Sequence, residues 1–358
     1  MTRIVICGEA WGKDEAVAKR PFVGASGREL NRMLEEAGLL PPGTAYNLNR
    51  DLWRGIYANR DATFEAASIH LTNVFNIQPK GNRIPELCQK EHVDGLPGIR
   101  NGQYVRREFY HHLERLRAEL SDKKPNLIIG LGATASWFAI GSGSITKIRG
   151  AVAASPYGKF LPTFHPAYLF RDSWHLRPVV VFDLIKAARE AAYPEVRRPE
   201  RFIYVPETID DITKIIPEIS LADRLSVDIE TVADQITCIG FAWTTQHCLV
   251  IPIFDWRRET KSYWSANEEP HVWQLIKELC QLPPEKVFQN GMYDIHFLWR
   301  RYGITVRNPR HDTMLLHHAL QPEVQKGLGF LGSIYSNEPA WKLMRAKGEQ
   351  TVKDQREE

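Results

Sequence analysis

The sequence contains little that suggests an extracellular or membrane setting. No C-x-x-C pair occurs, no signal peptide opens the chain, and no apolar run reaches the length of about 18 residues that a membrane-spanning helix needs. The cysteines are odd in number and widely spaced: Cys7, Cys88, Cys238, Cys248 and Cys280. Such spacing is neither a disulfide framework nor a zinc-finger pattern. We therefore expect reduced thiols and a cytoplasmic protein.

The sequence also lacks a strong charge of either sign. Its 46 Lys and Arg residues nearly balance 43 Asp and Glu residues, which leaves a formal net charge of +3. This balance neither requires nor excludes a nucleic-acid partner, so any DNA-binding surface must be a local patch. With 358 residues, 43% of them hydrophobic, the chain is long enough for two or more globular domains.

The most informative stretch is residues 8–27, GEAWGKDEAVAKRPFVGASG. It follows the apolar run of residues 4–7, which is typical of a buried strand. After it, apolar residues recur at helical spacing: Leu30, Met33, Leu34 and Ala37. The stretch is neither a dinucleotide fingerprint nor a P-loop, because it lacks G-x-G-x-x-G and G-K-[ST]. From the pattern alone, a ligand site and an ordinary glycine-rich loop are equally compatible with it.

Three further buried strands are predicted in the first half of the chain, over residues 69–75, 126–132 and 160–164. The first runs into Asn76 and a loop with basic residues, and the last delivers His165. In open α/β sheets, ligands bind at the carboxyl ends of the strands. The polar residues at these strand ends are therefore candidates for one site, although asparagine is also common in plain turns.

These segments resemble, in chain order, the motifs of the family 4 uracil-DNA glycosylases. Residues 8–27 match G-E-x-P-G-x-x-E followed by R-P-F-V-G-x-A-G, with Trp11 at the position of the proline. Residues 71–83 resemble the family's T-N-V motif, and residues 165–171, HPAYLFR, match its H-P-A-Y-L-x-R motif. The resemblance covers residues 4–186. It implies a three-layer α/β/α sandwich on a four-stranded parallel sheet, and excision of uracil from DNA.

The resemblance also implies roles for individual residues. Phe22 would stack on a flipped uracil, Asn73 would read its Watson–Crick edge, and His165 would donate to O2 of the leaving base. By the resemblance, Ala10 would lie in the uracil pocket, at the position where the best-known uracil glycosylases carry a water-activating aspartate. Orienting water, or stabilising the sugar cation, would then fall to Glu15 or Glu9, and we rank Glu15 first.

DNA contacts follow from the same resemblance. The loop that contains Leu169 would fill the gap left by the flipped nucleotide. Basic residues near the motifs are candidate phosphate contacts: Lys80, Arg83, Lys147, Arg149 and Arg171.

One departure from the family concerns its cofactor. Family 4 enzymes hold a four-iron, four-sulfur cluster on cysteines. Here Ile77 stands at the position of the motif cysteine, and the chain begins too late for the family's amino-terminal cysteine pair. The resemblance therefore implies a glycosylase without an iron–sulfur cluster or other cofactor, stabilised by packing.

The second half of the chain follows a different pattern. We predict a first domain over residues 1–193, a Pro- and Arg-rich linker over 194–201, a second domain over 202–345 and a charged tail over 346–358. Closely spaced short strands begin at residue 202, which favours antiparallel pairing.

Two carboxylates share one face of a predicted strand in this second domain, Asp228 and Glu230. The pattern D-x-E is also common by chance. Downstream, residues 290–294 resemble the N-x-x-[FY]-D motif of the 3′–5′ exonucleases with a DEDD active site, as in the proofreading domains of family A DNA polymerases. That resemblance implies a ribonuclease H-like fold with a mixed sheet, in which Asp228, Glu230 and Asp294 bind Mg²⁺ or Mn²⁺.

The exonuclease resemblance is incomplete at its carboxyl end. The family's fourth carboxylate lies in a Y-x-x-x-D motif, of which only Asp354 is present here, with Gln350 in place of the tyrosine. Three nearby histidines, His311, His317 and His318, are interpreted as ordinary helix residues rather than as a metal site.

Three functions therefore remain open. The leading one is a uracil-DNA glycosylase of a bacterial cytoplasm or phage-infected host, acting in base excision repair and coupled to a DNA polymerase or other replication proteins. The second is a metal-dependent 3′–5′ exonuclease fragment of a phage-type polymerase. The third is a non-catalytic DNA-binding module, which would bind uracil-containing DNA without releasing a product.

Overall fold

The computed structural model describes residues 3–54, 64, 68–92, 99, 103–232, 234–336 and 338. Contacts divide these residues into two compact units. Unit 1 contains the described residues up to Arg197 together with those from Gly329 onward, and unit 2 is Arg198–Leu328. Within the described part of the chain, every helix is too short or too polar to span a bilayer.

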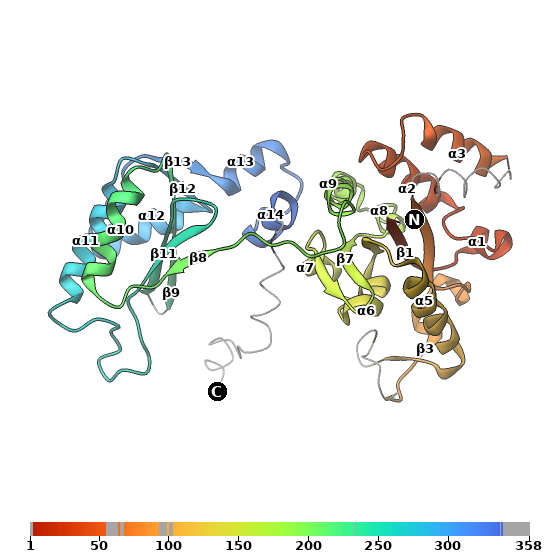
Figure 1. Ribbon diagram of the computed structural model, residues 1–358, viewed down its shortest axis with the longest axis horizontal. Helices are drawn as coiled ribbons and strands as arrows, with labels where there is room; N and C mark the ends of the chain where they lie inside the picture. Colours follow the sequence, from red (N-terminus) through yellow and green to blue (C-terminus); the bar gives the residue numbers. More distant parts are fainter. Residues whose placement is uncertain are drawn as a thin grey trace. The chain divides into compact units, whose positions relative to one another are not determined.

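Unit 1 is built on a five-stranded sheet in the order β2-β1-β5-β7-β6. Figure 1 labels two of its strands, β1 and β7. The strands β1 (Ile4–Ala10), β2 (Ile69–Phe75), β5 (Leu127–Leu131) and β7 (Gly158–Thr163) are parallel. This confirms the predicted four-stranded parallel sheet. A short strand, β6 (Ala153–Ser155), pairs antiparallel with β7 at one edge.

Helices cover both faces of this sheet. On one face, α5 (Tyr110–Lys123) and α6 (Ala133–Ile140) pack on β1 and β2, and Val5 and Cys7 join the apolar stripe of α5 in one core. On the other face, α9 (Arg177–Glu190) lies on β5 and β7, and α2 (Ala25–Glu36) packs on α9. The predicted three-layer sandwich is therefore present. The apolar face predicted for α2 is fully buried.

Short elements connect these layers: α1 (Lys13–Ala18), α3 (Thr44–Trp53), η1 (Lys80–Asn82), η2 (Ile84–Leu87), β3 (Cys88–Gln89), β4 (Tyr104–Val105), η3 (Arg107–Phe109), α7 (Ile145–Ile148), α8 (Pro166–Leu169) and η4 (Trp174–Leu176). The element α8 is a single turn whose N-cap is His165, the second residue after the end of β7. It therefore holds His165 at the carboxyl end of the sheet.

Unit 2 contains a six-stranded mixed sheet in the order β13-β12-β9-β10-β11-β8. Its strands are β8 (Phe202–Tyr204), β9 (Arg224–Val232), β10 (Gln235–Ala242), β11 (His247–Pro252), β12 (Glu285–Phe288) and β13 (Pro309–Asp312). The predicted antiparallel pairing holds for β9, β10 and β11. It is wrong for β8, which pairs parallel with β11. The helix α10 (Ile209–Ser220) lies between β8 and β9 in the chain and allows them to run in the same direction.

Three further helices complete unit 2: α11 (Glu269–Gln281), α12 (Gly291–Tyr302) and α13 (Thr313–Leu320). Along β9, apolar residues alternate with exposed polar ones, so Asp228 and Glu230 share one face as predicted. His317 and His318 lie in α13, as expected. His311 does not lie in a helix. It is part of β13, where its Nε2 lies 2.9 Å from a Glu285 carboxylate oxygen.

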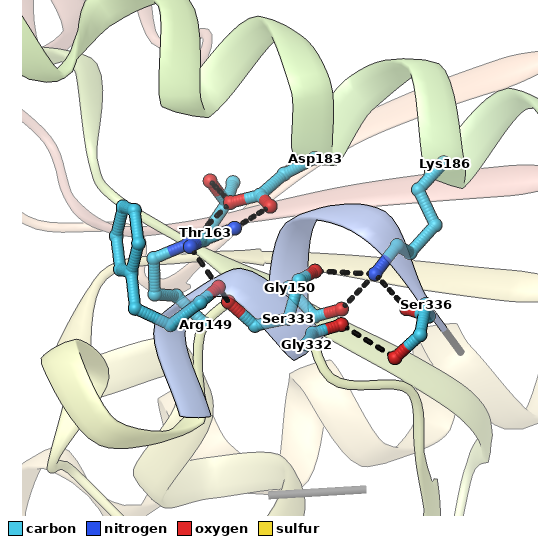
Figure 2. A network of polar contacts seen from close by, with 9 residues as sticks. Arg149, Gly150, Thr163, Asp183, Lys186, Gly332, Ser333 and Ser336 are labelled. Atoms are coloured by element: carbon cyan, nitrogen blue, oxygen red, sulfur yellow. Dashed lines mark hydrogen bonds and ion pairs between the residues drawn. The ribbon is translucent and has the colours of Figure 1, made fainter. Parts of the chain in front are cut away.

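The helix α14 (Leu328–Tyr335) differs from the predicted domain limits. The limits of 202–345 place it with the second domain, whereas its contacts from Gly329 onward are with unit 1. Figure 2 shows the reason: the Lys186 ammonium donates to the carbonyl oxygens of Gly150, Ser333 and Ser336. The last carbonyls of a helix have no partner within it, so a buried lysine at this end secures the helix to unit 1. Residues 339–358, including Asp354, lie outside the described part of the chain.

Candidate active site

A cavity of about 190 Å³ lies at the carboxyl end of the unit 1 sheet. Its lining includes the predicted catalytic and uracil-binding residues: Glu9, Ala10, Glu15, Phe22, Asn73 and His165. They come from the ends of β1 and β2, from α1 and the loop that follows it, and from the residue that caps α8. The structure thus brings together residues that are 156 positions apart in the chain.

Glycines allow the aromatic wall of this cavity to form. A Cβ atom on Gly8 would lie 2.2 Å from Asn73 Oδ1 and 2.7 Å from Phe22 Cζ. A Cβ atom on Gly27 would lie 1.7 Å from the Phe22 carbonyl oxygen. The Phe22 backbone itself has a φ of 57°, a conformation that side-chain-bearing residues rarely adopt. The loop is therefore shaped to place the Phe22 ring beside the end of β1.

The Phe22 ring faces His165 across the cavity. Their ring centroids lie 6.2 Å apart with an interplanar angle of 28°. Asn73 is buried, and its backbone carbonyl accepts a hydrogen bond from the Arg115 guanidinium on α5. This contact fixes the end of β2 and therefore the position from which the Asn73 amide reaches the cavity.

The two candidate glutamates differ in what holds them. Both Glu15 carboxylate oxygens accept backbone N–H groups, from Gly24 at 2.9 Å and from Gly12 at 3.2 Å. Glu15 is the third residue of α1, so it closes a capping interaction and ties the two ends of the loop together. Glu9 accepts one hydrogen bond, from the Thr134 hydroxyl to Oε2. It also borders a neighbouring cavity of about 330 Å³.

One hydrogen bond decides which nitrogen of the neutral His165 ring carries the proton. Its Nδ1 accepts the backbone N–H of Ala167 at 3.1 Å. Since a backbone N–H can only donate, Nδ1 carries no proton, and the neutral ring must carry its proton on Nε2. Burial lowers the pKa of His165, the nearby carboxylates of Glu9 and Glu15 oppose this shift, and the Arg171 charge adds to it. The net shift is downward, which favours the neutral ring.

Two of the predicted DNA contacts are wrong. Arg149 is 2% exposed, and its guanidinium is bound to the buried Asp183 carboxylate and to the Ser333 hydroxyl (Figure 2). Leu169 is 1% exposed, because the single turn of α8 packs against α2 and directs this side chain inward. The remaining candidates are exposed and stay predictions: Lys80, Arg83, Lys147 and Arg171.

Exposed aromatic residues lie close to Leu169, and no role was predicted for them from the sequence. Tyr168 and Phe170 flank Leu169 and are 43% and 51% exposed, and Trp174 is 50% exposed. The sequence does contain these three aromatic residues within the seven positions 168–174.

An iron–sulfur cluster does not fit the described residues of unit 1. A four-iron cluster needs four thiolate ligands. Cys7 and Cys88 are the cysteines in this part of the chain, and burial raises the pKa of the Cys7 thiol to about 12. Among the residues that the structure describes, no group of three or more His, Cys, Asp or Glu side chains is arranged to hold a metal ion.

The three carboxylates predicted to bind metal in unit 2 differ in how exposed they are. Asp228 and Glu230 are exposed on β9, while Asp294 on α12 is 4% exposed and accepts the Ile229 backbone N–H at 3.0 Å. Burial raises the pKa of Asp294 to about 6, and the negative charge of Asp228 adds to the shift. Three carboxylates of this kind fit the donor preference of Mg²⁺ or Mn²⁺, although in the described residues they are not preassembled as a metal site.

Comparisons with known proteins find a family match for each half of the chain. Residues 1–182 match the uracil DNA glycosylase superfamily, and residues 203–355 match the 3′–5′ exonuclease family. A type-4 uracil-DNA glycosylase from Thermotoga maritima is 32% identical over 190 residues, which is 52% of this chain and 76% of the relative. The type-4 enzyme from Archaeoglobus fulgidus is 28% identical over 173 residues, 46% of this chain and 65% of the relative.

Structural comparison finds ribonuclease D from Escherichia coli, at 16% identity and a TM-score of 0.30. The match covers 38% of this chain and about a third of that protein, 34%. This similarity is too low to add to the family matches. The matched segments show that the chain belongs to the uracil DNA glycosylase superfamily through residues 1–182 and carries a 3′–5′ exonuclease domain over residues 203–355.

Proposed function

We propose that unit 1 hydrolyses the N-glycosidic bond of deoxyuridine in DNA. The observation that carries this proposal is the convergence of Phe22, Asn73 and a neutral His165 on one cavity of about 190 Å³. A glycosylase must extrude its target base and hold it in such a pocket. An aromatic face, an amide and a single N–H donor are suited to the flat ring and polar edge of uracil.

The proposed reaction depends on charge that develops on the leaving base. As the bond from C1′ to N1 breaks, its electron pair moves onto the uracil ring, and negative charge accumulates on O2. The His165 Nε2–H donates to O2, and this hydrogen bond is stronger in the transition state than in the ground state. The Asn73 amide accepts from N3–H and donates to O4, and Phe22 stacks on the ring.

Water is then required at C1′ of the sugar. We assign its orientation to Glu9 rather than to Glu15, because both Glu15 oxygens are engaged by backbone N–H groups. Ala10 supplies no polar side chain at the position of the water-activating aspartate. The proposed role of Glu15 is to hold the loop that carries Phe22, through Gly12 and Gly24.

A second candidate function belongs to unit 2. The exposed pair Asp228 and Glu230, with Asp294 contacting the same strand, favours a metal-dependent 3′–5′ exonuclease. These three carboxylates would hold Mg²⁺ or Mn²⁺, and the bound ions would activate water and stabilise the leaving 3′ oxygen. DNA is the proposed substrate of both units, and the cytoplasm is their proposed location.

One oligonucleotide separates these functions. A labelled DNA strand with a single internal deoxyuridine is incubated with the full chain in EDTA and, in parallel, in Mg²⁺. Alkali-labile cleavage at the uracil in EDTA is the expected result for the glycosylase. Shortening from the 3′ end only in Mg²⁺, with the uracil intact, would replace the glycosylase with the exonuclease. Tight binding without either product would leave a non-catalytic module.

Replacing Gly8 with alanine is expected to lower the rate of uracil excision by about 100-fold, as misplacement of a positioning group by about 1 Å can do. The added methyl group would overlap Asn73 and Phe22, both of which must move out of place. Gly143→Ala is the matched control, because its Cβ would meet its nearest neighbour at an ordinary 3.7 Å. Single-turnover rates of the two variants test this account, and equal rates would contradict it.

A further inference from the structure

Exposed aromatic rings gather on the segment that follows His165. Phe170 and Trp174 are 51% and 50% exposed, and their ring centroids lie 5.8 Å apart with an interplanar angle of 32°. Single exposed rings are common on protein surfaces, whereas neighbouring exposed rings that form one apolar patch often mark a binding site. Neither ring belongs to the cavity lining at His165, so the function proposed above does not account for them.

The Trp174 ring is held in place before any ligand binds. The Arg177 guanidinium lies 5.9 Å from the centre of the Trp174 ring. This guanidinium is itself fixed by ion pairs with two carboxylates of α2, Glu29 at 2.7 Å and Glu36 at 2.8 Å. A ring anchored in this way loses little conformational entropy when a flat ligand stacks on it.

A cation connects these rings to the base cavity. Arg171 follows Phe170 in the chain, is exposed, and lines both cavities that His165 borders. Among the described residues it makes no ion pair, so its charge is available to an anionic ligand. Stacking rings beside a cation are what proteins use to bind single-stranded nucleic acid, in which base faces are open.

We propose that Phe170 and Trp174 stack on an unpaired base next to the flipped uridine, with Arg171 at a neighbouring phosphate. This inference rests on the proposed function, because it takes the strand that enters the His165 cavity as the ligand. In an intact duplex with no flipped nucleotide, every base is paired and stacked on its neighbours, so its face is covered. We call Phe170, Trp174 and Arg171 the stacking platform, and we expect it to bind an unpaired strand more tightly than an intact duplex.

The test measures binding without turnover. The probe is a fluorescein-labelled single strand of thymine-containing DNA, and the dissociation constant of the full chain is measured by fluorescence anisotropy. Phe170→Ala and Trp174→Ala are each expected to weaken binding about tenfold, the usual effect of removing one stacking ring. Binding of the corresponding duplex is expected to change less than twofold. Tyr46→Ala, which removes a 72% exposed ring on α3, is the matched control and is expected to leave both constants unchanged.

A cycle with abasic spacers distinguishes stacking from a general loss of affinity. Spacers replace the nucleotides at the probe's centre one at a time. At one position the spacer removes the base that the rings contact, and it is expected to weaken binding by the wild-type chain about tenfold. The Phe170→Ala and Trp174→Ala variants have already lost this contact, so the same spacer should weaken their binding little further. Thermal melting checks that the variants remain folded.

Three results would overturn the inference: unchanged binding by both variants, equal losses on single strand and duplex, or additive effects of ring and base removal at every position. Failure of the proposed function is a separate result, because the probe contains no uracil. If the deoxyuridine strand is never cleaved but the effects of ring removal and base removal are non-additive, the stacking proposal is supported and the glycosylase proposal is wrong. If uracil is excised but the effects of ring removal and base removal are additive at every position, the stacking proposal is wrong and the glycosylase proposal is supported.

Discussion

Replacing His165 with alanine is expected to lower the rate of uracil release by about 10²–10³-fold, the usual effect of removing one donor to a developing oxyanion. The loss should appear in kcat, because the Nε2–H bond to O2 strengthens as the glycosidic bond breaks. The matched control is His175→Ala, an exposed histidine ten positions further along the same segment. If both variants retain the wild-type rate, His165 is not the donor.

The pH dependence of the same reaction provides an independent test. The neutral His165 accepts the Ala167 N–H at Nδ1, so protonation at Nδ1 would break this bond and turn the ring. Because burial lowers the pKa below the ordinary value of 6.5, the neutral ring persists as the pH falls through 6.5. We expect a single-turnover rate that is constant down to pH 6.5 and declines only below it. A decline centred above pH 6.5 would contradict this assignment.

The second large effect is on stability. Replacing Arg149 with methionine is expected to reduce the free energy of unfolding by about 3–5 kcal/mol, the usual effect of breaking a buried ion pair. The side chains of Arg149 and Asp183 are 1% and 0% exposed. Without the guanidinium, the Asp183 carboxylate keeps only the Thr163 hydroxyl, at 2.6 Å, of the partners shown in Figure 2. Urea denaturation of the full chain measures the change.

Two further variants make this stability prediction specific. Arg83→Met removes an exposed ion pair with Glu86 and is expected to change stability by less than about 1 kcal/mol. Adding Asp183→Leu to Arg149→Met removes both buried charges, and replacing a buried pair by apolar residues is often nearly neutral. The double variant should therefore be more stable than Arg149→Met alone. A double variant less stable than the single one would contradict the account.

The candidate site was largely predictable because it depends on strand order. Glu9 and Asn73 lie near the carboxyl ends of β1 and β2, His165 follows β7, and parallel strands place their carboxyl ends at one edge of a sheet. What each side chain does there was less predictable. Our proposal of Glu9 instead of Glu15 depends on the hydrogen bonds that Gly12 and Gly24 donate to Glu15, and such backbone contacts of a folded loop have no sequence signature.

The errors in the DNA contacts have a different origin. Arg149 lies in a short basic segment, but its burial depends on Asp183, which lies 34 positions later on α9. Leu169 matches the family motif, but the single helical turn of α8 determines which side chains of residues 168–170 face solvent. Both outcomes depend on tertiary packing, which local patterns do not contain.

Long-range contacts also explain where the predicted domain limits differ from the structure. The helix α14 follows the exonuclease segment in the chain, and its placement on unit 1 depends on Lys186, whose ammonium bonds to a Ser333 carbonyl 147 positions away. Nothing in the local sequence of α14 indicates this partner. In the same way, the direction of β8 follows from the crossover through α10 rather than from its own residues.

The most direct test of the central claim is the detection of free uracil. The full chain is incubated in EDTA with a DNA strand that contains one deoxyuridine, and the released base is quantified by chromatography. The account predicts one uracil per strand from the wild-type chain, and a rate about 10²–10³-fold lower from His165→Ala. Absence of free uracil from the wild-type chain, or equal release by the two proteins, would contradict the assignment of this site to uracil excision.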